Sequence, residues 1–230
     1  MKHACTMIIL LSQIQATSGI AQENEGLFYE PSVFSTKFLD YYLRVDSVLP
    51  RYSNVFYDPL VETICIPPFM PAWSFQIYHP VYEVVGKPGL KEYHEDTVQF
   101  IVQFERADKP IQFGGSKRAP KNKAQVTSRQ IPGQSATEIE FAFSAALSST
   151  RWPKSRDLLS IDGTEYHFVV HNRATDVLMW AQSILPEQGT RAKKLVDLSD
   201  LVGKFVLAKD DSDAGQILID IHHLCEELRK

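Results

Sequence analysis

The sequence of 230 residues lacks any apolar segment long enough to cross a membrane. A spanning helix needs about 20 apolar residues, and the longest candidate run, from Ala4 to Leu11, has fewer than half of these. A cationic excess is also missing, because the formal net charge is −4. Binding to nucleic-acid phosphates depends on clustered cations. These absences exclude a transmembrane anchor and argue against nucleic acid as a partner.

Local catalytic motifs are missing as well. The chain contains no Gly-x-Ser-x-Gly, His-Glu-x-x-His, Ser-x-x-Lys or Cys-x-x-Cys, and the segment 114–117 lacks the spacing of a phosphate-binding loop. Ser, His and Asp are all present, so a catalytic triad dispersed along the chain stays open. We predict no metal and no cofactor, and we favour a protein without enzymatic activity.

What the chain does have at its start is the pattern of a secretory signal peptide. Lys2 and His3 precede the apolar run, and small residues, Gly19 and Ala21, follow a polar stretch. We therefore expect residues 1–21 to be cleaved and the protein to be secreted or periplasmic. The alternative is a cytosolic N-terminal strand or helix.

Cysteine is scarce, with three residues in the chain: Cys5, Cys65 and Cys225. Cys5 belongs to the predicted leader, so Cys65 and Cys225 remain after cleavage. In an oxidising compartment these two predict one possible disulfide between an early strand and the last helix. The alternative is a pair of buried free thiols, because cysteine is among the most buried residue types.

The apolar pattern predicts an α+β fold. Five segments have the alternating or continuously apolar pattern of strands: residues 60–66, 73–78, 81–85, 97–105 and 138–145. A hairpin is predicted within 156–172, with a tight turn at Asp162-Gly163. Helical spacing predicts helices over 33–49, near 191–208 and after Ser212. We therefore expect a single domain, residues 22–230, in which an antiparallel sheet has helices packed on one face.

One segment, residues 109–129, is strongly basic and contains Lys117, Arg118, Lys121 and Lys123, with no acidic residue. Such a segment could bind an anion or an acidic partner. The alternative is a solvated connection between strands, in which lysines keep a sheet edge soluble. The partner we expect is another protein or an anionic component of the cell envelope.

Three titratable residues of the predicted strand 165–171 share one face: Glu165, His167 and His171. Residues two apart in a strand are about 6.6 Å apart, so Glu165 and His167 can pair, whereas His167 and His171 are too distant to share an ion. Exposed histidines without a ligand are the alternative. We expect this to be the solvated face of the sheet, together with four further polar residues: Gln99, Gln103, Glu138 and Glu140.

These observations favour an exported, non-enzymatic binding or interaction module that uses the solvated sheet face and the basic segment. One alternative is a periplasmic hydrolase in which His167 or His171 is the base and a carboxylate is its partner. Another is an inhibitor that neutralises a toxin or an enzyme through the basic segment.

Overall fold

The computed structural model describes residues 59–85, 91–96, 98–110, 123–148, 163–172 and 177–230. The predicted leader, the predicted helix over 33–49 and the first half of the predicted hairpin lie outside these residues. Within them, the chain forms the α+β fold that the sequence predicts.

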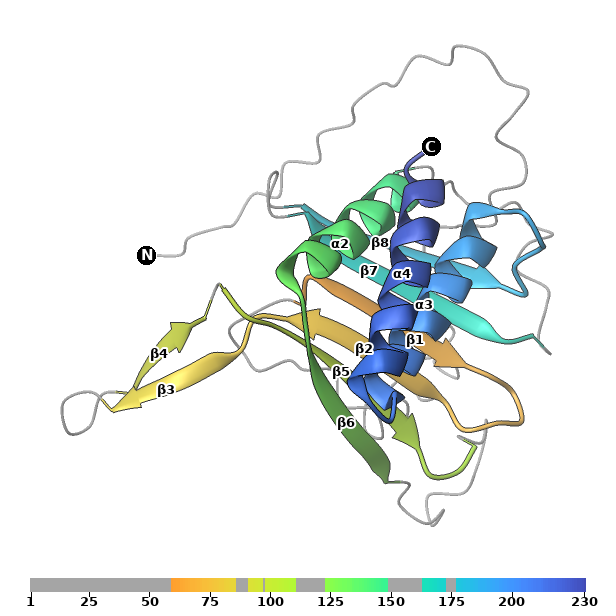
Figure 1. Cartoon of the computed structure of the whole chain (residues 1–230). Coiled ribbons are helices and arrows are strands. Elements are labelled where there is room, and N and C mark those ends of the chain that lie inside the picture. The colour runs from red at the N-terminus through yellow and green to blue at the C-terminus, as the bar shows by residue number, and fades with distance from the viewer. Residues whose placement is uncertain (1–58, 86–90, 97, 111–122, 149–162, 173–176) are drawn as a thin grey trace, which may run out of the picture.

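Six strands form one antiparallel sheet in the order β6-β5-β2-β1-β7-β8 (Figure 1). They are β1 (Val61–Ile66), β2 (Trp73–Tyr78), β5 (Phe100–Ala107), β6 (Ala124–Ile131), β7 (Glu165–Asn172) and β8 (Val177–Ile184). A separate antiparallel pair, β3 (Val81–Val85) and β4 (Lys91–Glu95), projects from the end of the main sheet (Figure 1). Among the described strands, β6 and β8 are therefore the two edges of the main sheet.

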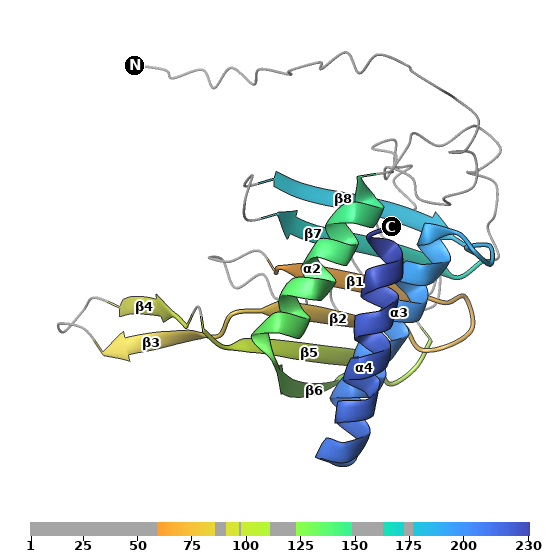
Figure 2. The same cartoon turned by 45° about the horizontal axis from the view of Figure 1, so that its top comes forward.

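The three helices of the described residues lie on the same face of this sheet (Figure 2). They are α2 (Gly133–Leu147), α3 (Arg191–Leu207) and α4 (Asp211–Leu228). Both α3 and α4 begin at a residue whose side chain caps the helix N-terminus: Thr190 accepts a hydrogen bond from the backbone N–H of Lys193, and Asp210 accepts one from that of Asp213. The two C-terminal helices predicted from the sequence are confirmed.

The hydrophobic core lies between the helices and the face of the sheet that they cover. Phe143 of α2 is fully buried and meets Phe75 of β2 edge-on, with 6.3 Å between ring centroids. It contacts Phe168 of β7 in the same way, at 6.1 Å. Edge-to-face pairs of this kind add to the free energy gained from burying aromatic area. These contacts fix α2 over the central and β8-side strands.

The strand predicted over 138–145 is wrong, because this segment lies within α2. Its buried residues recur at helical spacing, as Ala136, Ile139, Phe143 and Ala146 show. Phe141 and Phe143 do not share a face: Phe143 is buried, whereas Phe141 is 56% exposed. The alternation Ile-x-Phe-x-Phe imitated a strand, but the alanine-rich sequence around it favours a helix.

The other four predicted strands are confirmed. The strands predicted at 60–66, 73–78, 81–85 and 97–105 correspond to β1, β2, β3 and β5. Sequence reasoning missed β4, β6 and β8. β6 begins at Ala124, near the end of the basic segment 109–129, and extends past it to Ile131. β8 pairs with β7 over eight residues, from Val177 opposite Asn172 to Ile184 opposite Glu165.

Candidate functional site

The outer strand β8 is the most unusual surface among the described residues. Residues 177–185, VLMWAQSIL, contain no charged side chain. Val177 and Leu178 are each 48% exposed, and Trp180 is 36% exposed. We call these three residues the apolar edge. Natural proteins usually protect an edge strand with lysine, proline or a bulge, because its unpaired backbone groups can accept another strand.

The burial of β8 changes along its length. Ala181 and Ser183, in its second half, are buried on the helix side. The residues before them, Val177 to Trp180, are exposed or half-buried. The second half therefore anchors β8 to the core, while the first half exposes apolar side chains.

The opposite edge has a different chemistry. β6 has the sequence AQVTSRQI, and most of its side chains are polar and exposed. Its one cation, Arg129, is half-buried and donates hydrogen bonds to the backbone oxygens of Phe205 (3.0 Å) and Ala208 (3.1 Å). The two edges of one sheet thus differ in polarity, and β8 is the apolar one.

The face of the sheet that points away from the helices, here the far face, holds the three predicted residues of β7. Glu165, His167 and His171 alternate with Tyr166 and Phe168, as the sequence predicts. The Nε2 atom of His167 lies 3.0 Å from Oε1 of Glu165. His167 is 6% exposed, so the expectation of a solvent-facing histidine is wrong for this residue. Its partner is the carboxylate two positions earlier.

Four further polar residues of the far face form hydrogen-bonded pairs across three strands. Gln76 Nε2 donates to Glu62 Oε1 (2.8 Å), and Gln103 Nε2 donates to Glu105 Oε1 (2.6 Å). All four side chains are buried. Burial raises the pKa of Glu105; the hydrogen bond from Gln103 lowers it, the charge of Glu62 raises it, and the net change is upward. This part of the far face was expected to be solvated, and the structure corrects that expectation.

The other predicted far-face residues are dispersed. Gln99 precedes β5 and its backbone oxygen contacts the ring of His79 (2.8 Å). Glu138 and Glu140 belong to α2, on the helix side of the sheet, where Glu140 is buried. Glu138 accepts a hydrogen bond from Nδ1 of His222 in α4 (2.9 Å). The structure therefore does not gather these residues into one surface.

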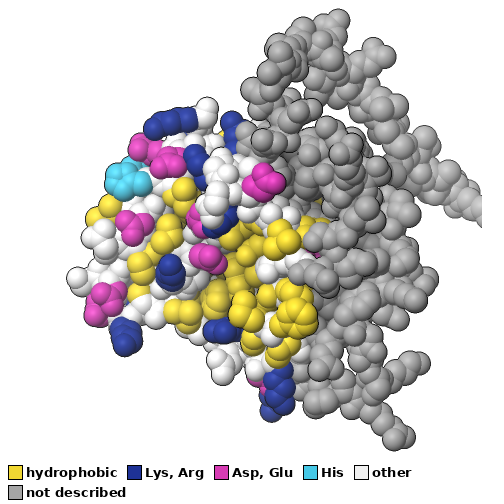
Figure 3. All heavy atoms as spheres, turned by 90° about the vertical axis from the view of Figure 1, so that its right-hand side faces the viewer, with side chains coloured by type: hydrophobic (Ala, Val, Ile, Leu, Met, Phe, Trp, Pro, Cys, Tyr) yellow, Lys and Arg dark blue, Asp and Glu magenta, His cyan; other side chains and the backbone are white. Residues whose placement is uncertain are grey.

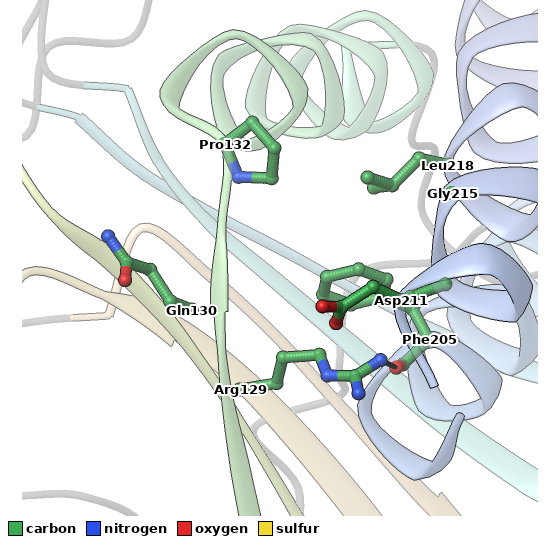
Figure 4. Close-up of a pocket in the computed structure, with 8 residues that line it drawn as sticks. Arg129, Gln130, Pro132, Phe205, Asp211, Gly215 and Leu218 are labelled. Carbon is green, nitrogen blue, oxygen red and sulfur yellow. Dashed lines mark hydrogen bonds between the residues drawn. The ribbon is translucent and has the colours of Figure 1, made fainter. Parts of the chain in front are cut away.

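A pocket of about 340 Å³ lies between β6, the start of α2 and the first half of α4 (Figure 4). Arg129, Gln130, Asp211 and Phe205 line it together with small and aliphatic residues. The guanidinium group of Arg129 donates hydrogen bonds to the carbonyls at the end of α3, where the helix dipole favours a cation. None of the pocket's lining residues is a histidine, so it does not provide the base of the predicted hydrolase.

The predicted disulfide is not formed. Cys65 and Cys225 are both free and buried. Burial raises the pKa of each thiol to about 12, so neither is a thiolate at neutral pH. Cys65 lies on a central strand and Cys225 on the last helix, and each serves as a small apolar residue of the core.

Most of the predicted basic cluster lies outside the described residues, namely Lys117, Arg118 and Lys121. Lys123 is exposed just before β6, and its backbone N–H donates to the carboxylate of Asp108 (3.1 Å). The role of this cluster stays a prediction.

No family model, curated protein or solved structure matches this chain. In the described ranges, no group of three or more His, Cys, Asp or Glu side chains is placed to hold a metal ion. None of the helices in the described part of the chain combines the length and apolar character needed to span a bilayer. The function must therefore be argued from the surfaces themselves.

Sequence reasoning missed the apolar edge, although a signal for it was present. Residues 177–185 are uncharged and contain valine, isoleucine and tryptophan, which are enriched in strands. The alternation that marks a half-buried strand is absent, because both faces of the first half are exposed. Attention to the missing charge would have identified the segment.

Proposed function

We propose that this protein is a non-enzymatic binding module whose strand β8 accepts an extended segment of a partner protein as a seventh strand. The observation that carries the proposal is the apolar edge, Val177, Leu178 and Trp180. These residues are exposed on an outer strand that has no charge, proline or bulge. In strand addition, backbone hydrogen bonds provide affinity, and contacts with alternate side chains provide specificity.

The chemistry of β8 defines the partner segment. Leu178 and Trp180 lie on the far face of the sheet and are two residues apart. A paired strand would place alternate side chains beside them. We therefore expect an extended, uncharged segment with apolar residues at every second position, because an unpaired charge beside these side chains would lose hydration.

The test uses extended peptides selected on the full chain from a random display library. We expect the selected peptides to be apolar at alternate positions and to protect the outward backbone amides of β8 from hydrogen exchange. The substitution Leu178→Lys should weaken binding about tenfold or more, because it places a charge beside the added strand.

The matched control is Val126→Lys, since Val126 is exposed on the other edge strand, β6, at 54%. This variant should bind the peptides as the wild type does. The proposal fails if Leu178→Lys binds equally well, or if protection from exchange appears away from β8.

Export is part of the proposal and depends on the predicted leader, residues 1–21. Mass spectrometry of the protein secreted by an expressing cell should give a mature N-terminus near Gln22. A chain that retains Met1 and stays in the cytoplasm would contradict export without affecting the strand-addition test.

The hydrolase remains the second candidate, and the close contact between His167 and Glu165 supports it. If it is correct, His167→Ala should abolish hydrolysis of at least one ester, amide or glycoside in a chromogenic panel, while Phe141→Ala leaves it unchanged. Absence of any turnover by the wild type would remove this candidate.

A further inference from the structure

The loop between the two central strands β1 and β2 projects apolar side chains from one end of the sheet. Phe69 is 81% exposed and Met70 is 62% exposed. We call these two residues the apolar tip. Pro67, Pro68 and Pro71 surround them, and proline restricts the backbone even before folding. The tip is thus held outward by a short, conformationally restricted loop.

A third exposed apolar residue lies at the same end of the sheet. Ile66 of β1, Glu165 of β7 and Ile184 of β8 are neighbours in register, so Leu185 follows β8 at the end where the apolar tip follows β1. Leu185 is 57% exposed and has a φ of 49°. That backbone conformation is unfavourable for leucine. Figure 3 looks onto this end and shows hydrophobic side chains gathered across it.

Cations lie beside the apolar tip. Arg106 of β5 is opposite Trp73, the first residue of β2, and the backbone of the next residue, Ala107, donates to Ala72 (2.9 Å). Lys109 and Lys123 follow at the start and end of the β5–β6 connection, and all three cations are exposed. In Figure 3, Lys and Arg side chains lie along the lower margin of the hydrophobic area, while Asp and Glu side chains lie within it and to its left.

Acids also lie at this end. Burial raises the pKa of Cys65 and of Tyr166, and Asp200 of α3 is close enough to raise each further. Asp108 follows β5 on the side of the cations. Its carboxylate accepts the N–H of Lys123 (3.1 Å), and its own N–H donates to the carbonyl of Lys123 (2.8 Å). These two bonds hold Lys123 beside the end of β5. The end of the sheet therefore combines a projecting apolar loop with a cationic margin on its β5–β6 side.

We propose that this end of the sheet docks on a membrane surface containing anionic lipids, with Phe69 and Met70 entering the boundary between headgroups and acyl chains. A protein cleft would also accept a projecting side chain. The cationic margin favours the lipid surface, because anionic headgroups attract exposed lysine and arginine while the apolar side chains insert.

This docking surface is separate from the apolar edge used in the proposed function. Leu178 and Leu185 are seven residues apart along an extended segment, which corresponds to about 20 Å. A partner strand that pairs with the first half of β8, from Val177 to Trp180, therefore does not cover the apolar tip. The membrane proposal does not depend on the strand-addition proposal.

The test is flotation of the full chain with two kinds of vesicle, one of phosphatidylcholine and the other of phosphatidylcholine mixed with phosphatidylglycerol. We expect binding to the mixed vesicles that weakens as salt is added. The double variant Phe69→Ser/Met70→Ser should bind about tenfold or more weakly, because both insertions are lost. The triple variant Arg106→Gln/Lys109→Gln/Lys123→Gln should lose the preference for mixed vesicles.

The matched control is Phe141→Ser, which also removes an exposed phenylalanine, but from the helix layer. It should bind as the wild type does. All variants keep residues 1–21, so any binding by that apolar segment is common to them. The proposal is overturned if the wild type does not float, or if the double variant floats equally well. It is also overturned if the wild type binds a protein through the apolar tip and binds neither kind of vesicle.

Discussion

At the scale of single residues, an ion pair joins α2 and α4 within the helix layer. His222 of α4 donates from Nδ1 to Oε2 of Glu138 in α2, and its Nε2 lies 3.8 Å from Glu226. The hydrogen bond to Glu138 raises the pKa of His222 above its ordinary value of 6.5. Burial raises the pKa of Glu138, but hydrogen bonds from His222 and Gln134 outweigh it and lower that pKa below 4.5.

These opposite shifts predict a stability contribution with a defined pH range. The contribution of His222 is complete below pH 6.5 and is lost as the pH rises through its raised pKa; that of Glu138 is complete above pH 4.5 and is lost as the pH falls through its lowered pKa. The pair therefore stabilises the protein most between these values. The urea midpoint of His222→Ala should fall further below that of the wild type at about pH 5.5 than at about pH 8.5.

His223 provides the control because it is the next residue on α4 and is exposed. His223→Ala should change the urea midpoint little and to the same extent at both pH values. An equal deficit of His222→Ala at both pH values would show that packing, rather than the ion pair, accounts for its effect.

At the scale of elements, α2 shows how a local pattern can mislead. Phe141 and Phe143 are two residues apart, which would place both on one face of a strand but places them on different sides of a helix. We predict that Phe143→Ala lowers the free energy of unfolding by about 3–5 kcal/mol, because it leaves a cavity among Phe75, Phe168 and their neighbours. Phe141→Ala should change it by less than about 0.5 kcal/mol. Urea unfolding of both variants measures this, and equal losses would favour the strand.

An element could be predicted from the sequence where one of its faces packs against the core, because that packing makes its apolar residues periodic. β1, β2, β5, α3 and α4 pack one face or both against the core, so their apolar periodicity is regular. β6 and β8 are edges, and an edge strand is not required to alternate where neither of its faces is covered. Each pairs with the strand that precedes it in the chain, β6 with β5 and β8 with β7, so the signal that the sequence lacked was the alternation within the edge strand itself.

The same reasoning explains the outcome for the candidate site. The alternation of Glu165, His167 and His171 could be derived from the two-residue period of a strand. The burial of His167 depends on what covers the whole sheet face, so it could not be derived from that period. The apolar edge was visible only as a lack of charge, and the apolar tip as a phenylalanine and a methionine among prolines.

At the scale of the whole molecule, stability depends on joining the helix layer to the sheet at the β6 side. Arg129 extends from this edge to the end of α3, where it bonds two carbonyls and lies over the ring of Phe205, 5.5 Å from its centroid. The end of a helix leaves carbonyl groups without partners. Arg129 supplies a donor for the carbonyl of Ala208 and a second donor for that of Phe205, which also accepts the N–H of Ala208 (3.3 Å). It thereby connects the edge strand to the turn that leads into α4.

We therefore predict that Arg129→Ala lowers the free energy of unfolding by about 2–3 kcal/mol, because two charge-assisted hydrogen bonds are lost and the carbonyls are left half-buried. Arg129→Lys should recover less than half of this loss, since an ammonium group cannot reproduce the forked geometry of a guanidinium. Gln130→Ala, at the exposed neighbouring position of β6, should have little effect. If Arg129→Lys is as stable as the wild type in urea unfolding, the positive charge alone joins the layers. If Arg129→Ala is as stable as the wild type, the aromatic core around Phe143 holds the helices to the sheet without Arg129.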